Sequence, residues 1–347
     1  VNFVAALLIF GMILFHWGKS ELPLSNIHTG LYYSDILVGE GFQQQDKVLA
    51  INDVEPNSIG DVFNALIING ERDVVVLRGN DTVSLTMSED LSQRYLAFAN
   101  DYDRGEREKE RADKSYHKKN HVAISYFSPF VIDSVIPGGA ASFANMQRGD
   151  SIVGVNDVQN LCYVQITNEL AKYPCDSVTL SFYREGDLKQ ARLFIGDQAK
   201  IGVYAKAENA FYSFVHTDYT FFQAIPAGIE MGVDFLVSYV KQFRVIFTKE
   251  GAQSLGGFGA ISSMFPETWN WYGFWYITAV LSLVLAFMNF LPIPALDGGY
   301  ILFLIWEIIT RRKPSDKFLE IANTIGFWLL LALMIFANGN DIFKAFF

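Results

Sequence analysis

The sequence predicts a mixed protein: an α-helical membrane domain with three transmembrane helices, into which two α+β domains are inserted. Three observations support this prediction. Long apolar segments lie near both ends of the 347-residue chain. Between them, from about residue 24 to residue 206, apparent strands, turns and charged residues alternate, and this part contains an internal repeat. With 51% hydrophobic and 18% charged residues, the chain is too apolar for an ordinary soluble enzyme.

Charge and cysteine content exclude some functions. The net charge of −10 and the isoelectric point near 5.0 argue against a nucleic-acid partner, because nucleic acids favour basic surfaces. The two cysteines, Cys162 and Cys175, do not have CxxC spacing, so we expect no structural zinc site made from them. Both a disulfide and two free thiols are compatible with the sequence.

The first segment, residues 1–22, is expected to be a transmembrane helix. It is apolar almost throughout, and Trp17 and Lys19 are suitable anchors at the membrane–water interface. A signal peptide would have a basic start and a small-residue cleavage site, and neither is present. Because the chain opens on Val1 rather than Met, we expect this helix to belong to a longer protein.

The middle of the chain contains two copies of one domain. The segment from Asp46 to Asp53 is repeated from Asp150 to Asp157, at an offset of 104 residues, and the same offset relates two further blocks. Constant spacing over several blocks indicates duplication. Each copy is expected to contain a strand with an Asn-Asp turn, a short helix, a further strand and a hairpin.

The second copy, residues 121–206, resembles the bacterial type of PDZ domain over Phe130 to Ala141 and Arg148-Gly-Asp150. The first copy, residues 23–120 with its charged loop, looks like a more divergent version. PDZ domains bind extended peptides by adding a strand to a sheet edge, so the resemblance implies peptide ligands. The alternative is a pair of spacers that filter substrates by size and bind nothing tightly.

The charged loop, residues 101–121, mixes both signs and has few apolar residues, which is typical of a solvated loop or an exposed helix. His117 and His121 stand four residues apart, the spacing of a zinc-binding helix. No Glu follows His117, however, and two lysines lie between the histidines, so we expect no metal there. We assign no chemistry to the isolated His16, His28 and His216.

Residues 207–265 are expected to form an amphipathic segment at the membrane surface. In a helix from Ala227 to Lys249, the charged residues gather on one side and apolar residues on the other. Such a helix is able to lie on a bilayer. A helix packed on soluble domains would show the same pattern.

The C-terminal membrane domain, residues 266–347, contains an apolar tract (residues 274–306) whose only ionisable acid is Asp297. One continuous helix of this length would reach about 50 Å, whereas a hydrocarbon core is about 30 Å thick. Pro292 and Pro294 remove backbone donors, and Gly298-Gly299 lower the cost of unusual dihedral angles, so the tract should break there. A carboxylate at membrane depth costs about 2.5–3.5 kcal/mol and is therefore expected to have a function.

The stretch Asn289-Phe-Leu-Pro292-Ile-Pro294-Ala-Leu-Asp297-Gly is similar to the third metal-ligand motif of the site-2 protease family, zinc proteases that cut inside membranes. The resemblance implies that Asp297 binds Zn²⁺ and that Asn289, Pro292 and Pro294 contact the substrate. The alternative is that Asp297 caps a following helix, from Gly298 to Thr310.

Proteases of this family also carry a His-Glu-x-x-His helix, whose imidazoles bind zinc and whose Glu activates water. That motif does not occur in this sequence, so we expect no catalytic residue here and place the motif in a missing N-terminal part. The resemblance implies an intramembrane zinc endopeptidase that cuts single-pass membrane proteins, such as anti-sigma factors or remnant signal peptides. The alternative is a non-catalytic membrane adaptor, or pseudoprotease, with a PDZ pair.

A last transmembrane helix is expected from about Asp316 to Ala337. The loop before it is the most basic between predicted helices, and positive loops stay cytoplasmic. The inserted domains and the C-terminus should then lie on the opposite side. The resemblance to the RseP-like branch of the family implies the bacterial inner membrane, with the PDZ domains on the periplasmic side.

Overall fold

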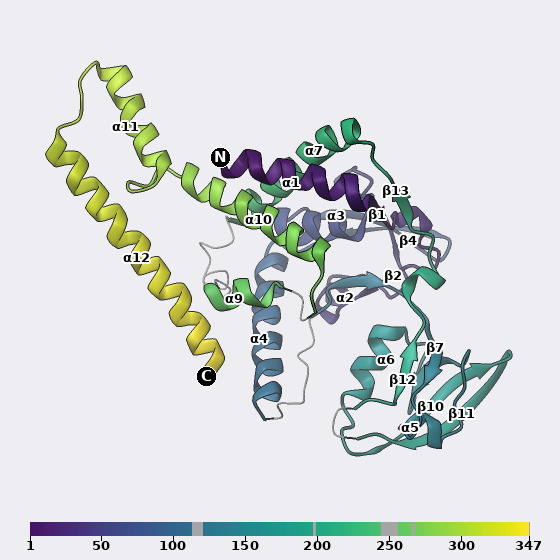
Figure 1. Ribbon diagram of the computed structural model, residues 1–347. Coiled ribbons are helices and arrows are strands. Elements are labelled where there is room, and N and C mark those ends of the chain that lie inside the picture. The colour runs from purple at the N-terminus through teal and green to yellow at the C-terminus, as the bar shows by residue number, and fades with distance from the viewer. Residues whose placement is uncertain (113–120, 197–198, 244–255, 266–267, 347) are drawn as a thin grey trace. The chain divides into compact units, whose positions relative to one another are not determined.

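The computed structural model describes residues 1–112, 121–196, 199–243, 256–265 and 268–346 (Figure 1). The chain divides into two units: a helical unit of residues 1–20 and 216–347, and an inserted unit of residues 21–215. The predicted mixture of a β-rich part and long apolar helices is confirmed. Strands β1 (Lys19–Glu21) and β13 (Val215–Thr217) form a two-stranded sheet where the chain passes between the units.

The helical unit has its core where three helices pack together. Buried side chains from α1 and α10 meet there, with partly buried side chains from α7 against them. The helices described in this unit are α1 (Asn2–Trp17), α7 (Phe221–Phe243), α9 (Phe258–Ser263), α10 (Trp271–Phe290), α11 (Asp297–Thr310) and α12 (Asp316–Phe346).

Glycines let α7 approach α1 closely. A Cβ atom at Gly228 would lie 2.4 Å from the backbone nitrogen of Gly11, and one at Gly232 would lie 2.4 Å from Leu7. Small residues four apart allow this kind of helix contact, which is common in membranes. Helix α7 starts at Phe221, ahead of the predicted Ala227, and the predicted end of this helix lies outside the described residues.

Two of the described helices are long and apolar enough to cross a membrane: Trp271–Phe290, with 20 residues, and Asp316–Ile342, with 27. Helix α1 is apolar but has only 16 residues, so the structure does not show the three predicted spans. Helix α12 continues past Ala337, so Asn338-Gly339 does not end the helix as the sequence predicts. Weak helix formers cost at most about 1 kcal/mol each, and Asn338 also donates to the Met334 carbonyl one turn back.

The inserted unit contains the duplicated elements in the predicted order. The first copy comprises β2 (Leu31–Tyr33), α2 (Asp35–Gly39), β3 (Lys47–Ile51), α3 (Ile59–Phe63), η2 (Asn64–Asn69), β4 (Asp73–Arg78), β5 (Asp81–Thr86), α4 (Leu91–Ala112) and β6 (Ile124–Tyr126). The second comprises β7 (Phe130–Val135), α5 (Ala140–Phe143), β8 (Ser151–Val155), β9 (Val158–Gln159), α6 (Tyr163–Leu170), β10 (Ser177–Arg184), β11 (Asp187–Phe194) and β12 (Val203–Ala205). Short 3₁₀ turns flank the copies: η1 (Leu24–Asn26) and η3 (Glu208–Ala210).

Strand pairing follows the same plan in both copies. The order β3-β4-β5 in the first corresponds to β8-β10-β11 in the second, and β2 pairs with β6 as β7 pairs with β12, all antiparallel. Each copy has its own buried cluster of apolar side chains. Ile124 of β6 belongs to the first cluster, although it follows the sequence boundary at residue 121.

Each copy also has the same buried ion pair. Arg78 donates from Nε and Nη2 to Asp46, at 2.9 and 2.7 Å, and Arg184 donates in the same way to Asp150, at 2.7 and 2.6 Å. Both carboxylates are 1% exposed, and each also accepts a main-chain N–H from three residues earlier. Bidentate, charge-assisted contacts of this kind are among the stronger polar interactions.

Candidate functional site

The apolar tract breaks where the sequence predicts. Helix α10 ends at Phe290 and α11 begins at Asp297, with an irregular loop, residues 291–296, between them. Pro292 and Pro294 offer no N–H, so a helix through both would lose two hydrogen bonds. The loop instead closes on itself, because Ile293 donates to the Leu291 carbonyl at 2.7 Å and Leu296 donates to the Ile293 carbonyl at 3.1 Å.

The two glycines after Asp297 act differently from the prediction. Neither Gly298 nor Gly299 has a positive φ, so neither supplies an unusual dihedral angle. Both are buried, and added Cβ atoms would lie 2.3 Å from the Leu291 carbonyl oxygen and 2.5 Å from the Ile293 carbonyl oxygen. Their function is close approach, because the absence of side chains lets the start of α11 pack against the loop.

Asn289 and Asp297, at the two ends of this break, line one cavity of about 370 Å³. Asn289 lies in the last turn of α10 and Asp297 is the first residue of α11. The other lining residues are Val1, Asn2, Phe3, Ala286, Phe290 and Ile301. Pro292 and Pro294 shape the loop but do not line this cavity. The structure thus brings together two of the four residues that the sequence singled out.

The Asp297 carboxylate does not act as a helix cap. The capping position of α11 is Leu296, and no side chain caps this end. Among the described residues, no hydrogen bond or ion pair to the Asp297 carboxylate is found, and the side chain is exposed. A negative charge in the first turn is still favourable because it faces the positive end of the helix dipole. The carboxylate is therefore available to a ligand.

Zinc fits this site only in part. A carboxylate oxygen is a suitable zinc ligand, but zinc normally requires three protein ligands. Within the described parts of the chain, no three His, Cys, Asp or Glu side chains lie together in a way that could hold a metal. Asp297 could supply one ligand of a zinc site, and the others would have to come from outside these residues.

Of the two histidines in the charged loop, the structure describes one, His121, and places it among aromatic side chains. His117 lies outside the described residues. His121 packs against the rings of Tyr95, Phe98 and Tyr102, with centroid distances of 5.5, 4.6 and 5.4 Å. Burial lowers its pKa, which favours the neutral imidazole.

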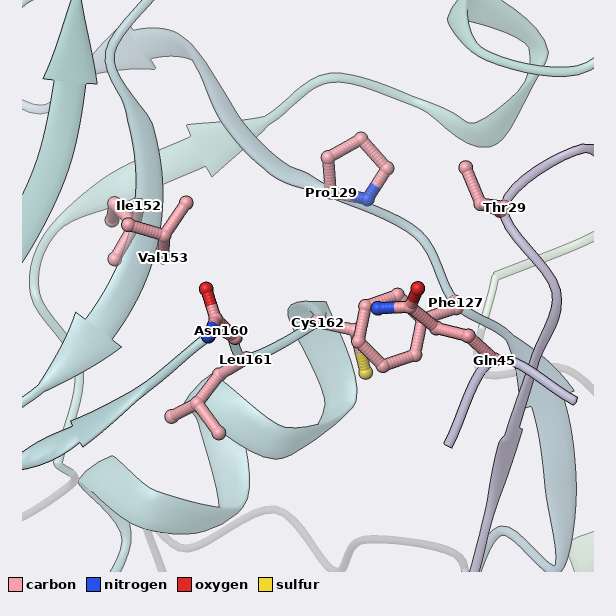
Figure 2. Close-up of a pocket in the computed structure, with 9 residues that line it drawn as sticks. All are labelled: Thr29, Gln45, Phe127, Pro129, Ile152, Val153, Asn160, Leu161 and Cys162. Atoms are coloured by element: carbon pink, nitrogen blue, oxygen red, sulfur yellow. The ribbon is translucent and has the colours of Figure 1, made fainter. Parts of the chain in front are cut away.

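A second cavity, of about 350 Å³, lies in the inserted unit (Figure 2). Its lining carries no acidic or basic side chain: Thr29, Gln45, Phe127, Pro129, Ile152, Val153, Asn160, Leu161 and Cys162. Cys162 is a free, buried thiol, and burial raises its pKa, so it is a poor nucleophile. This cavity offers a surface for binding and no group for catalysis.

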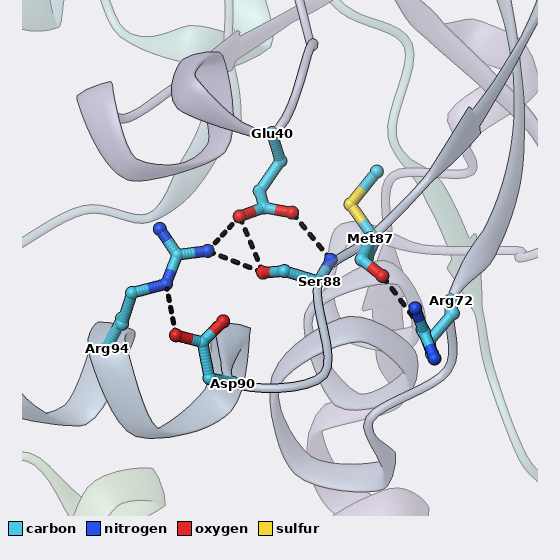
Figure 3. A network of polar contacts seen from close by, with 6 residues as sticks. All are labelled: Glu40, Arg72, Met87, Ser88, Asp90 and Arg94. Atoms are coloured by element: carbon cyan, nitrogen blue, oxygen red, sulfur yellow. Dashed lines mark hydrogen bonds and ion pairs between the residues drawn. The ribbon is translucent and has the colours of Figure 1, made fainter.

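The polar cluster around Glu40 is structural (Figure 3). The Glu40 side chain, 6% exposed, accepts hydrogen bonds from the Ser88 N–H at 2.7 Å and the Ser88 hydroxyl at 2.8 Å, and pairs with Arg94. Arg94 also contacts Asp90 at 3.2 Å. The cluster fastens the start of α4 to α2, and its charges are all paired. Burial alone would raise the pKa of Glu40, but the bonds from Ser88 and Arg94 outweigh burial and lower it.

Because of this cluster, we expect the stability of the folded protein to fall in acid. The pKa of Glu40 is lower in the folded than in the unfolded chain, so its stabilising effect is complete above the ordinary value of 4.5 and is lost as pH falls through the folded pKa. In Glu40→Gln, the midpoint of thermal unfolding should fall less between about pH 7 and about pH 3 than in the wild type. The variant lacks the carboxylate that takes up a proton when the wild type unfolds in acid. Circular dichroism of the protein in detergent would measure this, and equal pH slopes would contradict it.

Comparison with known proteins agrees with the loop motif. The profile of Peptidase family M50 matches residues 1–333. The zinc metalloprotease RasP of Geobacillus kaustophilus is 29% identical over 227 residues, covering 62% of this chain and 51% of the relative. The probable protease eep of Enterococcus faecalis is 28% identical over 218 residues, with 62% and 51% covered. The putative zinc metalloprotease Cj1068 of Campylobacter jejuni is 27% identical over 222 residues, with 61% and 59% covered.

The chain thus spans somewhat more than half the length of these relatives. Among solved structures, the PDZ domain of the SdrC-like protein from Listeria monocytogenes aligns with 24% of this chain and 93% of its own, at 17% identity and a TM-score of 0.21. The family match covers nearly the whole sequence, including the loop with Asn289 and Asp297. The chain belongs to peptidase family M50, the site-2 protease family of zinc metalloproteases.

Proposed function

We propose that this chain is part of an intramembrane zinc endopeptidase, in which Asp297 is a zinc ligand and Asn289, Pro292 and Pro294 contact the substrate. One observation carries the proposal: Asn289 and Asp297 line the same cavity, at a break between two apolar helices, in a chain of the M50 family. Irregular backbone at membrane depth is tolerated where it lines a cavity or is covered by protein, so such a break suits a site that works inside the bilayer.

Each residue has a separate role in this proposal. A bound zinc ion supplies Lewis acidity and lowers the pKa of a bound water. Asp297 holds the metal through a carboxylate that no other described side chain engages. The Asn289 amide has both a donor and an acceptor and can pair with an unwound substrate backbone. The prolines keep the loop from becoming helical. The remaining ligands and the general base belong to a His-Glu-x-x-His helix outside these residues.

The substrates in this proposal are single-pass membrane proteins, such as anti-sigma factors or remnant signal peptides. The protein would lie in the bacterial inner membrane with α1 as a third span and the inserted unit on the periplasmic side, since the basic loop after α11 favours the cytoplasm. Strand β12 ends its sheet, so its free edge could accept an extended peptide in the PDZ manner.

Metal removal tests the proposal. The full-length gene product, purified in detergent, should cleave a single-pass membrane reporter. Treatment with a zinc chelator should abolish cleavage, and added Zn²⁺ should restore it. Added Mg²⁺ should not, because Mg²⁺ is a small, hard cation that prefers oxygen ligands to imidazole nitrogens. Full activity in a preparation shown by elemental analysis to be free of zinc would refute the proposal.

The observation that favours a second function, a non-catalytic membrane adaptor, is that no three possible metal ligands lie together within the described residues. The gene sequence before the Val1 codon separates the two functions. A His-Glu-x-x-His motif on an apolar segment, within about 20 residues upstream, would support the protease. A complete gene without that motif would support the adaptor.

A further inference from the structure

A side chain of α12 reaches the loop between α10 and α11. The Oδ1 atom of Asn323 accepts the main-chain N–H of Ala295 at 3.1 Å, and its Nδ2 atom donates to the Tyr300 hydroxyl at 3.2 Å. Ala295 precedes Asp297 in the loop, and Tyr300 follows it in the first turn of α11. One amide therefore contacts the chain on both sides of Asp297: the backbone of Ala295 before it and the Tyr300 side chain after it.

The loop needs this outside partner. Of its residues 291–296, two are prolines and three of the other four donate to carbonyls in the loop or the last turn of α10. The Ala295 N–H instead reaches Asn323. Ala295 also has a φ of 79°, which is unfavourable for a residue with a side chain and persists only where surrounding contacts enforce it. Without Asn323, this N–H would lose the partner that the structure gives it.

Gly326, one turn further along α12, brings the helix backbone against the same loop. A Cβ atom there would lie 1.8 Å from the Pro294 carbonyl oxygen, a distance that no side chain tolerates. Small residues combined with a polar side chain are a common means of joining helices in membranes. The contact at Asn323 is thus supported by direct backbone packing.

We propose that Asn323 is a positioning residue for Asp297: it fixes the conformation of the loop, and thereby the place of the carboxylate that binds zinc. The proposal rests on the function proposed above for Asp297. It assigns α12 a part in the site beyond crossing the membrane.

The test compares variants of the full-length protein in detergent. Asn323→Ala removes both bonds, and Tyr300→Phe removes only the hydroxyl that orients the amide. Thr324→Val is the matched control, because the Thr324 hydroxyl donates to the Glu320 carbonyl of its own helix and, within the described residues, to nothing in the loop. Three quantities are measured: hydrogen exchange of a peptide covering residues 291–297, zinc affinity by chelator competition, and kcat and KM for the membrane reporter.

In Asn323→Ala, we expect exchange in this peptide to be about 10-fold faster and zinc affinity to be about 10-fold weaker, as for other groups that support metal ligands. The kcat should fall because zinc is held less well, and KM should rise as well because the loosened loop also carries Pro292 and Pro294, the substrate contacts proposed above. Tyr300→Phe should make exchange about 3-fold faster and zinc affinity about 3-fold weaker. If Asn323→Ala does not fold, Tyr300→Phe alone serves as the test. Thr324→Val should match the wild type.

Unchanged exchange in Asn323→Ala and Tyr300→Phe would overturn the inference. Faster exchange with unchanged zinc affinity and kcat would also overturn it, because the loop would then be held without effect on Asp297. Failure of the proposed function has another signature: Asp297→Asn would keep its zinc, whatever the exchange rates show.

Discussion

Replacing Asp297 with Asn is expected to abolish cleavage and to weaken zinc retention at least about 100-fold in the full-length protein, while both copies in the inserted unit stay folded. A neutral amide keeps the size of the side chain but loses the charge that binds the metal, and loss of a direct ligand should exceed the 10–100-fold cost typical of its supporting residues. No described residue bonds to this carboxylate, so folding should be little affected. Zinc content after dialysis and cleavage of a single-pass reporter measure the effect.

The matched control is Glu307→Gln, which removes a carboxylate from the same helix, α11, away from the cavity. It should retain zinc and activity. If Asp297→Asn binds zinc as tightly as the wild type, Asp297 is not a ligand and the protease mechanism proposed here is wrong. Equal losses in both variants would indicate damage to α11 rather than removal of a ligand.

Replacing Asp150 with Ala is expected to destabilise the second copy by about 3 kcal/mol or more. The Asp150 carboxylate is 1% exposed and accepts two bonds from Arg184, and breaking a buried pair leaves the other charge without compensation. Arg184 is 21% exposed, so water relieves part of this cost and the lower end of the usual 3–5 kcal/mol applies. Asp46→Ala should have a similar effect on the first copy.

Urea unfolding in detergent, followed by brief proteolysis and mass spectrometry, would locate the loss in one copy or the other. Asp133→Ala is the control, because its pair with Arg148 is largely exposed and such pairs contribute less than about 1 kcal/mol. If Asp150→Ala and Asp133→Ala shift the urea midpoint equally, the buried pair that the two copies share has no special importance for stability.

The sequence predicts those parts of the structure that local signals determine. Pro292 and Pro294 place the helix break because each removes a backbone donor. The repeated segments at Asp46 and Asp150 predict a shared order of elements because the same residues form the same strand and turn. Asp297 could be selected because it is the only ionisable acid in an apolar tract, whereas Asn289 was selected through the resemblance of the tract to the metal-ligand motif of the site-2 proteases.

Contacts between distant segments could not be predicted in the same way. Strand β6 follows α4 in the chain and pairs with β2, which precedes α4. Nothing in the sequence of Ile124–Tyr126 identifies β2 as its partner. Asn323 lies 28 residues from Ala295, and its polar side chain in an apolar helix was the one signal that could have drawn attention to it. For the glycines after Asp297, the sequence alone suggests dihedral freedom and not close packing, because close packing depends on which backbone lies opposite.

The pairing of β1 with β13 has a practical consequence. The strands carry the outgoing and returning chain, and the Ser20 hydroxyl lies 2.7 Å from His216 Nδ1 between them. Because the two ends of the inserted unit lie side by side, the unit can be exchanged for another domain, or replaced by a tight turn, without separating β1 from β13. Transplanting residues 21–215 between homologues, or deleting them, is therefore a feasible way to test whether the insert affects substrate choice in the proposed protease.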